Sequence, residues 1–251
     1  MLQLVSFFIY NIMKFIFKSE VVDYEFVFKN KQDTILLLHG WGGNMKSFCQ
    51  LEKFLTYDFN ILKLNMPTTC ETMTAWTVFD YCNLVENLIN LLGISNLNII
   101  CHSFGFRVAM LLNKKMKINK IIVTGGAGIF KVGLIRKIMM ENNKILLSNP
   151  RFKNLFNFIA SDDYKSLSRI GKITFKNIVN LNLISCIKFN SEMLLFWGKN
   201  DTSTKLWIAK KIKKINKCEL IVSKSDHFAY LKDNVKFCHY AINFMQVKKM
   251  L

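Results

Sequence analysis

At 251 residues, with 51% hydrophobic residues and two prolines, the chain can bury one sizeable core, which excludes a disordered or low-complexity protein. Its formal net charge of +18 suggests a nucleic-acid partner, but only four of the 35 basic residues are arginine, which base-reading and phosphate-clamping sites favour. Because the lysines are spread along the chain, we expect a solvated lysine surface, no nucleic-acid partner, and only weak attraction to anionic membrane surfaces.

The N-terminal segment has several interpretations. Residues 1–17 are strongly apolar but short for a membrane-spanning helix, and they lack the positive start and cleavage site of a secretory signal. Three alternatives stay open: a membrane-associating helix, a helix packed on the domain, and an upstream extension from a start before Met13. From Met13 the residues alternate as in a strand. We therefore separate residues 1–17 from a single domain over residues 18–251.

Strands and helices alternate along most of this domain. Continuous apolar runs such as 34–38 are typical of central parallel strands that are covered on both faces. Helical spacing of apolar residues, as over 77–92, predicts the helices between them. The alternation predicts an α/β fold with a mostly parallel central sheet and helices on both faces. The predicted strands are 14–17, 22–28, 34–38, 60–64, 97–101, 121–124, 193–197 and 219–222, and the predicted helices are 47–55, 77–92, 104–112, 205–215 and 234–244.

Residues 129–190 interrupt this alternation. They are lysine-rich, helical in pattern and without a clear strand. We predict that they form a small helical insertion within the domain. No linker that would separate two independent domains is visible in the sequence.

The cysteines and histidines indicate no metal site. They form no CxxC pair and no zinc-type cluster, so we predict neither a metal nor a cofactor. The scattered cysteines lie in apolar stretches and indicate reduced, buried thiols in a cytoplasmic protein, with membrane association through the N-terminal segment as the alternative. The cysteines are at 49, 70, 82, 101, 186, 218 and 238, and the histidines at 39, 102, 227 and 239.

The strongest local signal surrounds Ser103, in the stretch NIICHSFGF. Cys101 and Gly105 are small residues two positions before and after this serine, between a buried strand and a helix, which is the form of a nucleophile elbow. The helix that follows directs its N-terminal amides at the reacting centre. The alternative interpretation is an ordinary serine that caps a helix.

Three further turns follow predicted strands. The stretch HGWGG starts at His39, which we expect to organise its loop, and it can place the Trp41 amide opposite the Phe104 amide as an oxyanion hole. Asp201 ends LFWGKND, and His227 lies in SDHF. Alone, these residues would indicate a tight turn, a polar turn and a loop histidine. Their order along the chain, with each residue after the carboxyl end of a strand, favours one shared site.

Together these stretches resemble the α/β-hydrolase superfamily from about residue 20 to the C-terminus. HGWGGN resembles its oxyanion loop, AWTVFDYCNLV the helix before the elbow, CHSFGFRVAML the elbow, FWGKNDT the acid loop and SDHFAYL the histidine loop. The resemblance implies that Ser103 is the nucleophile, His227 the general base and Asp201 its orienting acid. It also implies that Trp41 and Phe104 are the oxyanion donors.

The chain departs from the family pattern in three places. Cys101 and Phe106 replace glycines of the elbow, and LNMPTTC at residues 64–70 replaces the usual D-x-P-G-x-G turn. Both changes could distort the placement of the serine. Ser203 and Thr204 stand where a proline is common after the acid loop, a change that we expect to affect only the loop.

The resemblance implies a serine hydrolase, of carboxylesterase or thioesterase type, that acts on a small ester or related acyl substrate through an acyl-enzyme. The insertion at 129–190 would then lie over the elbow as a cap, and its apolar residues indicate an apolar acyl pocket. The alternative is a catalytically weak or inactive ligand-binding protein on the same fold. A dehalogenase is disfavoured, because that variant needs a carboxylate where Ser103 stands.

Overall fold

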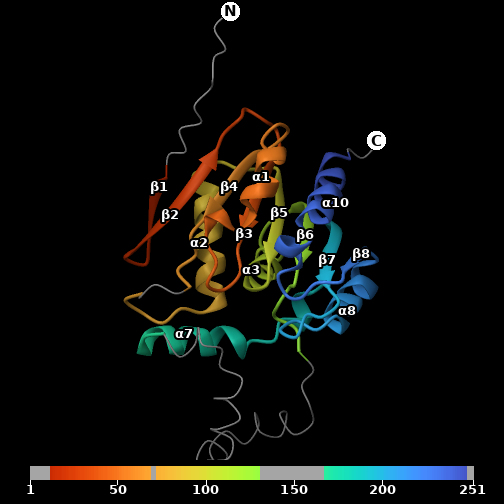
Figure 1. Cartoon of the computed structure of the whole chain (residues 1–251). Coiled ribbons are helices and arrows are strands. Elements are labelled where there is room, and N and C mark those ends of the chain that lie inside the picture. Colours follow the sequence, from red (N-terminus) through yellow and green to blue (C-terminus); the bar gives the residue numbers. More distant parts are fainter. Residues whose placement is uncertain (1–11, 69–71, 131–166, 248–251) are drawn as a thin grey trace, which may run out of the picture.

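A computed structural model describes residues 12–68, 72–130 and 167–247 of the chain (Figure 1). Its centre is one eight-stranded sheet with the order β1-β2-β4-β3-β5-β6-β7-β8. The strands from β4 to β8 in this order run parallel, whereas β2 pairs antiparallel with β4, and β1 antiparallel with β2. The strands are β1 Met13–Phe17, β2 Glu20–Val27, β3 Thr34–Leu38, β4 Asn60–Leu64, β5 Leu97–His102, β6 Ile118–Thr124, β7 Glu192–Gly198 and β8 Glu219–Ser223.

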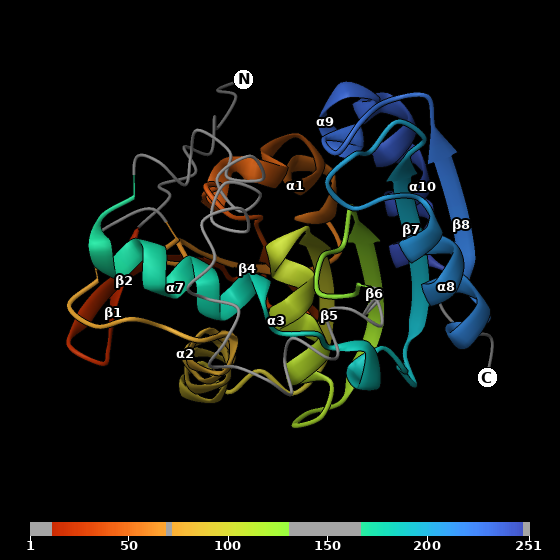
Figure 2. The same ribbon diagram turned by 90° about the horizontal axis from the view of Figure 1, so that it is seen from below.

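Helices cover both faces of the sheet (Figure 2), so the predicted fold class is confirmed. The central strands β3, β4 and β5 are buried at every position because apolar side chains from both layers of helices pack on them. One face of the sheet packs on three helices, α2 Val78–Leu91, α3 Phe104–Leu112 and α8 Trp207–Asn216. The other face packs on α1 Cys49–Leu55, α9 Ala229–Lys232 and α10 Asn234–Gln246. A 3-10 turn, η1 Met45–Phe48, precedes α1.

The start of α2 shows how local sequence sets a helix boundary. The Thr77 side chain accepts a hydrogen bond from the Asp80 amide, and the Asp80 carboxylate accepts one from the Thr77 amide at 2.7 Å. This reciprocal capping satisfies amides that the first helical turn leaves free. The chain leaves the helix near Gly93, whose φ of 63° suits glycine.

The N-terminal segment contributes a strand to the sheet. Residues Met13–Phe17 form β1 and pair antiparallel with β2, from Met13 opposite Tyr24 to Phe17 opposite Glu20. The two helical alternatives for residues 1–17 are therefore wrong over these five residues. The expected boundary after residue 17 falls in the hairpin between β1 and β2. Residues 1–11 lie outside the described residues.

The predicted insertion is described at its two ends only, because residues 131–166 lie outside the described residues. Its later part contains α7 Arg169–Val179 and a 3-10 turn, η2 Ile184–Cys186. Helix α7 crosses the carboxyl edge of the sheet (Figures 1 and 2). It is held there by a hydrogen bond from the Trp76 amide to Thr174 Oγ1 at 3.0 Å, and by one from Asn177 to the Trp76 carbonyl at 3.2 Å. The boundaries of the insertion stay a prediction.

The described cysteines are free thiols. Cys82, Cys101 and Cys238 are buried as expected, whereas Cys49 is exposed at the start of α1, so the prediction of buried thiols is wrong there. None of the helices in the described ranges combines the length and the apolar character that a membrane crossing requires.

Candidate active site

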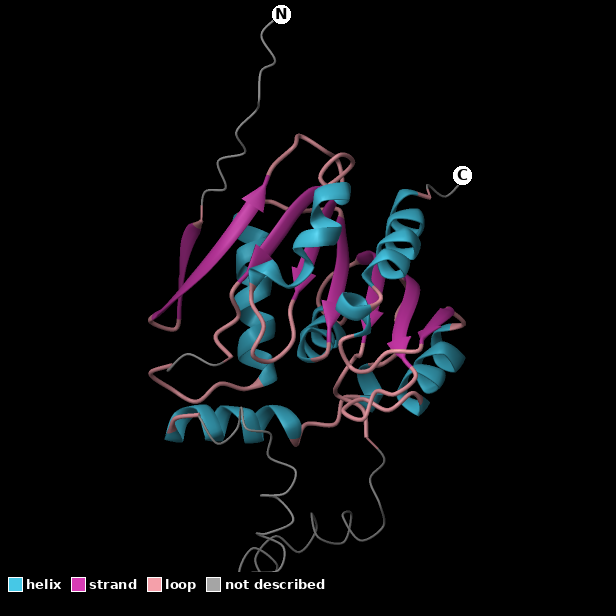
Figure 3. Ribbon diagram, in the orientation of Figure 1, coloured by secondary structure: helices cyan, strands magenta, loops and turns pink. Residues whose placement is uncertain are grey.

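Loops gather at the carboxyl edge of the sheet (Figure 3). The three residues predicted to form the triad meet there. Ser103 follows β5, Asp201 follows β7 and His227 follows β8. Ser103 Oγ lies 3.0 Å from His227 Nε2, and His227 Nδ1 lies 2.9 Å from Asp201 Oδ2. Neighbouring parallel strands bring their carboxyl ends to one edge, which explains how residues far apart in the sequence come into contact.

Ser103 has a strained backbone, with φ of 47° and ψ of −108°. A residue with a side chain adopts such a conformation at a cost of about 1–3 kcal/mol. The turn is tight enough that a Cβ atom on Gly105 would lie 2.4 Å from the Leu38 carbonyl oxygen. The Ser103 side chain makes no capping hydrogen bond to α3, so the helix-cap interpretation is wrong. Its hydroxyl points instead to His227.

The two departures at the elbow are accommodated inside the core. Cys101 is fully buried, with its Sγ 3.5 Å from the Ile122 carbonyl oxygen. Phe106 is also fully buried, and its ring stacks on Phe189 with 6.0 Å between centroids. A Cβ atom on Gly126 would lie 2.7 Å from the Phe106 ring, so a glycine there makes room for the larger side chain.

The side chain of Asp201 is completely buried and accepts three hydrogen bonds. Besides His227, the Thr204 amide donates to Oδ1 and the Thr204 hydroxyl to Oδ2, both at 2.7 Å. Burial alone would raise the pKa of Asp201, but the hydrogen bonds from His227 and Thr204 outweigh it and hold the pKa below its usual value. Thr204 was expected to affect only the loop, and the structure instead places it against two members of the predicted triad.

The contacts of His227 define its neutral tautomer. An ionised carboxylate only accepts hydrogen bonds, so Nδ1 carries the proton toward Asp201. Nε2 then presents a lone pair to the Ser103 hydroxyl. Gly125, with φ of 54°, allows the ring to lie close, because a Cβ atom there would be 3.0 Å from His227 Nδ1. This arrangement suits a group that takes a proton from the serine.

His39 organises the loop after β3, as expected from the sequence. Its Nδ1 lies 2.7 Å from the Gly40 carbonyl oxygen, and the Met66 amide donates to its Nε2 at 2.9 Å. Burial lowers the pKa of His39 to about 4, which keeps the ring neutral. Thr68 Oγ1 accepts a hydrogen bond from the Gly42 amide at 3.2 Å. The unusual segment 64–70 therefore holds this loop in place through its described residues.

The two residues predicted as oxyanion donors are neighbours. The rings of Trp41 and Phe104 lie 5.8 Å apart and nearly perpendicular. Within the described part of the chain, no acceptor is found for the Trp41 or Phe104 amide. Phe104 begins α3, so its amide is one of those that a helix leaves unsatisfied.

Aromatic rings continue from these residues to α7. Phe175 of α7 lies 5.3 Å from the Trp41 ring, and Tyr81 lies 4.9 Å from Phe104 and from Trp76. The described end of the predicted cap thus packs against the loop that carries Trp41, and the surroundings of this loop are largely aromatic.

His102 is a neighbour of the site that the sequence did not single out. Its ring lies 4.8 Å from His227 and 4.6 Å from Tyr230. Its Nδ1 lies 3.0 Å from the Thr124 carbonyl oxygen. Burial, followed by the nearby His227, lowers the pKa of His102 to about 3. The uncharged His102 ring therefore packs beside His227 at the site.

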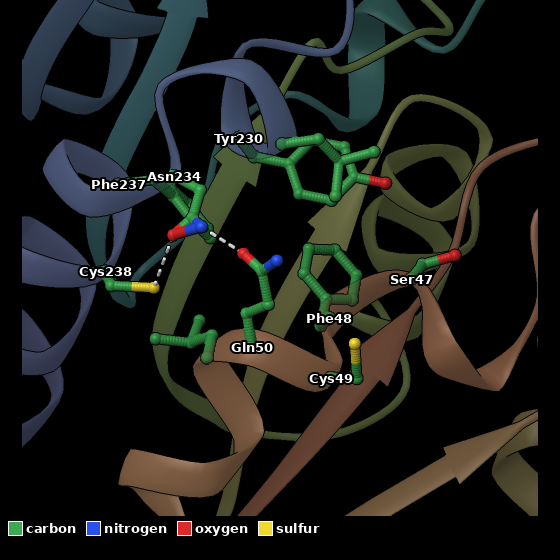
Figure 4. A pocket seen from close by; sticks show the side chains of 10 residues that line it. Ser47, Phe48, Cys49, Gln50, Tyr230, Asn234, Phe237 and Cys238 are labelled. Carbon is green, nitrogen blue, oxygen red and sulfur yellow. Dashed lines mark hydrogen bonds between the residues drawn. The ribbon is translucent and has the colours of Figure 1, made fainter.

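A small hollow lies between α1 and α10 (Figure 4). Gln50 and Asn234 form a hydrogen bond across it, and the Tyr230 ring separates it from His102. Ser103, Asp201 and His227 are not among its lining residues, so it is not the substrate site of the predicted triad. Within the described ranges no three potential ligands gather as they would around a metal ion.

The comparisons with known proteins agree with the fold described above. A family model described as the alpha/beta hydrolase fold matches residues 33–147, from β3 through the elbow and beyond. A solved hydrolase from Pseudomonas aeruginosa PA01 superposes with a TM-score of 0.73 at 14% identity, over 94% of this chain and 99% of that one. The chain has the α/β-hydrolase fold.

Other solved structures superpose to a similar extent. An esterase from Exiguobacterium antarcticum gives a TM-score of 0.69 at 16% identity, over 90% of this chain and 96% of that one. An enol-lactonase from Burkholderia xenovorans LB400 gives 0.70 at 13% identity, over 90% and 97%. At these identities the likeness concerns the fold. No curated protein matches the sequence significantly.

Proposed function

We propose that this chain is a serine hydrolase that acts on a small ester or related acyl substrate through an acyl-enzyme intermediate. The observation that carries the proposal is the unbroken path of hydrogen bonds from Asp201 through His227 to Ser103. It ends on a serine held in a strained turn at the carboxyl edge of the sheet. Such a path is the geometry that an activated nucleophile requires.

In this mechanism His227 Nε2 takes the hydroxyl proton as Ser103 Oγ attacks the acyl carbon. Asp201 stays ionised because the hydrogen bonds from His227 and Thr204 hold its pKa below the usual value, and its charge beside Nδ1 stabilises the imidazolium that forms. The imidazolium then gives its proton to the leaving group, and the acyl group stays on Ser103. A water molecule, activated by the same ring, releases the acid and restores the serine.

The amides of Trp41 and Phe104 are the proposed donors to the oxyanion. Both amides lack an acceptor within the described residues, and the Phe104 amide lies at the positive end of α3. The strained φ of Ser103 supports this role, because the elbow lifts the hydroxyl out of the sheet and toward the start of the helix.

The proposed substrate is a carboxylic ester or a thioester with an apolar acyl group. The support is the aromatic surroundings of the oxyanion loop, where the Trp41 ring packs on Phe104 and on Phe175 of α7. The esterase and the enol-lactonase among the superposable structures carry out chemistry of this class. We propose a cap over the elbow in the predicted insertion, with α7 as its described part.

The alternative, an inactive ligand-binding protein, was based on the glycine replacements at the elbow. It loses support because Cys101 and Phe106 are both accommodated in the core, while Ser103 stays 3.0 Å from His227. The two candidates differ in a measurable property, the nucleophilicity of Ser103.

Covalent labelling with a fluorophosphonate probe tests the proposal. We expect the wild-type protein to label, and Ser103→Ala and His227→Ala to lose labelling, because one removes the nucleophile and the other its base. The matched controls are Ser185→Ala and His239→Ala, which change a serine in η2 and an exposed histidine of α10. Both controls should label like the wild type.

Absence of labelling in the folded wild-type protein would overturn the proposal and favour the ligand-binding alternative. Labelling that survives Ser103→Ala would assign the reactive group to another residue. If the wild type labels, turnover of short and medium p-nitrophenyl esters and of acyl thioesters then defines the acyl group.

A further inference from the structure

We propose that Thr204 is a positioning residue of this site, whose hydroxyl holds the Asp201 carboxylate and the His227 ring in the pairing that makes Nε2 the base. The inference rests on the proposed function and adds a fourth residue to it. Thr204 is named because its side chain contacts two of the three residues of the predicted triad.

The first step of the argument is the geometry around the carboxylate. The Thr204 amide donates to Asp201 Oδ1 and its hydroxyl to Oδ2, each at 2.7 Å. One residue thus contacts both oxygens, so the carboxylate cannot rotate about its Cβ–Cγ bond without losing a hydrogen bond. These two contacts fix the orientation of the Asp201 carboxylate plane relative to His227 Nδ1.

The second step concerns the proton on His227. A hydroxyl group has one proton, and Thr204 gives it to Asp201, so a lone pair of Thr204 Oγ1 is free to face His227 Nδ1 at 3.2 Å. The Nδ1 proton then has two acceptors, Asp201 Oδ2 at 2.9 Å and Thr204 Oγ1. Two acceptors on this side favour the tautomer that leaves Nε2 unprotonated and facing Ser103.

The third step is that Thr204 is itself held in place. It is 5% exposed, and its carbonyl oxygen accepts a hydrogen bond from Trp197 Nε1 at 2.6 Å. Trp197 lies in β7 and is fully buried. Thr204 is therefore anchored to strand β7 through this hydrogen bond. A group that positions catalytic residues needs such support from regular structure.

A purely structural role of the Thr204 hydroxyl would predict different activities for the Thr204 variants. The turn from Asp201 to Thr204 is closed by the Thr204 amide, which any residue with an amide proton would supply. If the hydroxyl served only to fill space, the isosteric variant Thr204→Val would keep full activity. If the hydroxyl positions the pair, Thr204→Val loses turnover and Thr204→Ser retains it.

The test compares two pairs of variants that differ in the hydroxyl: wild type against Thr204→Val, and Thr204→Ser against Thr204→Ala. The matched control is Thr34→Val, because Thr34 is 4% exposed and begins β3, at the far end from the oxyanion loop. With a short p-nitrophenyl ester, we expect kcat to fall about tenfold, or about 1.4 kcal/mol, in Thr204→Val with KM unchanged. Thr204→Ser and Thr34→Val should keep the wild-type kcat.

A second readout does not depend on turnover. The Nδ1 proton of His227 should give a low-field proton resonance in nuclear magnetic resonance spectra, which His227→Ala identifies by its loss. We expect this resonance to shift or broaden in Thr204→Val and Thr204→Ala, and to stay in Thr204→Ser and Thr34→Val.

The outcomes separate the two proposals. An active wild type with full kcat in folded Thr204→Val overturns the role of Thr204 and leaves the hydrolase proposal standing. An inactive wild type overturns the hydrolase proposal, and the resonance then decides whether Thr204 holds the Asp201–His227 pair. If Thr204→Val does not fold, the Ser and Ala variants decide, and equal kcat in the two overturns the inference.

Discussion

Two clusters of buried and half-buried polar side chains among the described residues differ in how their hydrogen bonds are arranged. The ionic cluster consists of Glu25 of β2, Glu52 of α1 and Lys63 of β4. Lys63 Nζ lies 2.7 Å from Glu52 Oε1 and 3.1 Å from Glu25 Oε2, so its ammonium bridges the two carboxylates. The site cluster consists of Ser103, Asp201, Thr204 and His227. Its hydrogen bonds instead converge on one carboxylate, Asp201, which accepts from Thr204 and from His227, and the His227 ring accepts from the Ser103 hydroxyl.

The difference shows that burial of charge alone does not identify an active site. All three residues of the ionic cluster are regular members of strands or helices, and each charge faces an opposite one. The site cluster includes Ser103, whose φ of 47° is strained and which follows β5 at the carboxyl edge of the sheet. We infer that the ionic cluster stabilises the fold, whereas the site cluster gives up stability for a reactive group.

The largest expected effect is on activity, in Asp201→Asn. The amide removes the negative charge that stabilises the imidazolium and favours the wrong tautomer of His227, so we expect kcat/KM to fall by about 10⁴-fold. The matched change in the ionic cluster, Glu52→Gln, should lower the stability of the protein and leave kcat/KM of the folded protein at the wild-type value. Equal losses of activity in both variants would contradict the distinction between the clusters.

The next effect is on stability, in Lys63→Met. This change leaves two buried carboxylates, Glu25 and Glu52, without their common partner, so we expect the free energy of unfolding to fall by about 3–5 kcal/mol. Urea denaturation followed by circular dichroism measures the loss. Lys210→Met, on the exposed side of α8, should cost less than about 0.5 kcal/mol. Similar stabilities for the two variants would show that the ionic cluster contributes little.

The smallest expected effect is a gain of stability in Ser103→Gly. Glycine adopts a positive φ without strain, so this variant should be more stable than the wild type by about 1 kcal/mol, while being inactive. Ser103→Ala keeps a Cβ atom and thus the strain, and should show no such gain. If both variants unfold at the same urea concentration, the elbow carries no measurable strain.

The sheet could be predicted because its strands are continuous apolar runs. The predicted ranges 34–38 and 60–64 coincide with β3 and β4, which are buried on both faces. The predicted helix at 205–215 begins later in the structure, at Trp207. The delay has a physical cause, since Thr204 is engaged with Asp201 and the residues after it complete the turn before the helix starts.

Three of the residues that form the site could be predicted, because the carboxyl ends of parallel strands converge and Ser103, Asp201 and His227 each follow one. Thr204 and His102 could not, because their contacts with His227 depend on distances that only the folded chain defines. One signal was present: an aspartate followed three positions later by a threonine favours a turn closed by the aspartate side chain.

Because His102 is neutral, it adds no positive charge beside His227 and Ser103. With its ring 4.8 Å from His227, a charged His102 would repel the imidazolium on which the proposed reaction depends. Because burial lowers the pKa of His102 to about 3 and that of His39 to about 4, neither ring binds a proton near neutral pH. Of the three imidazoles of His39, His102 and His227, only that of His227 would carry a positive charge in the proposed reaction.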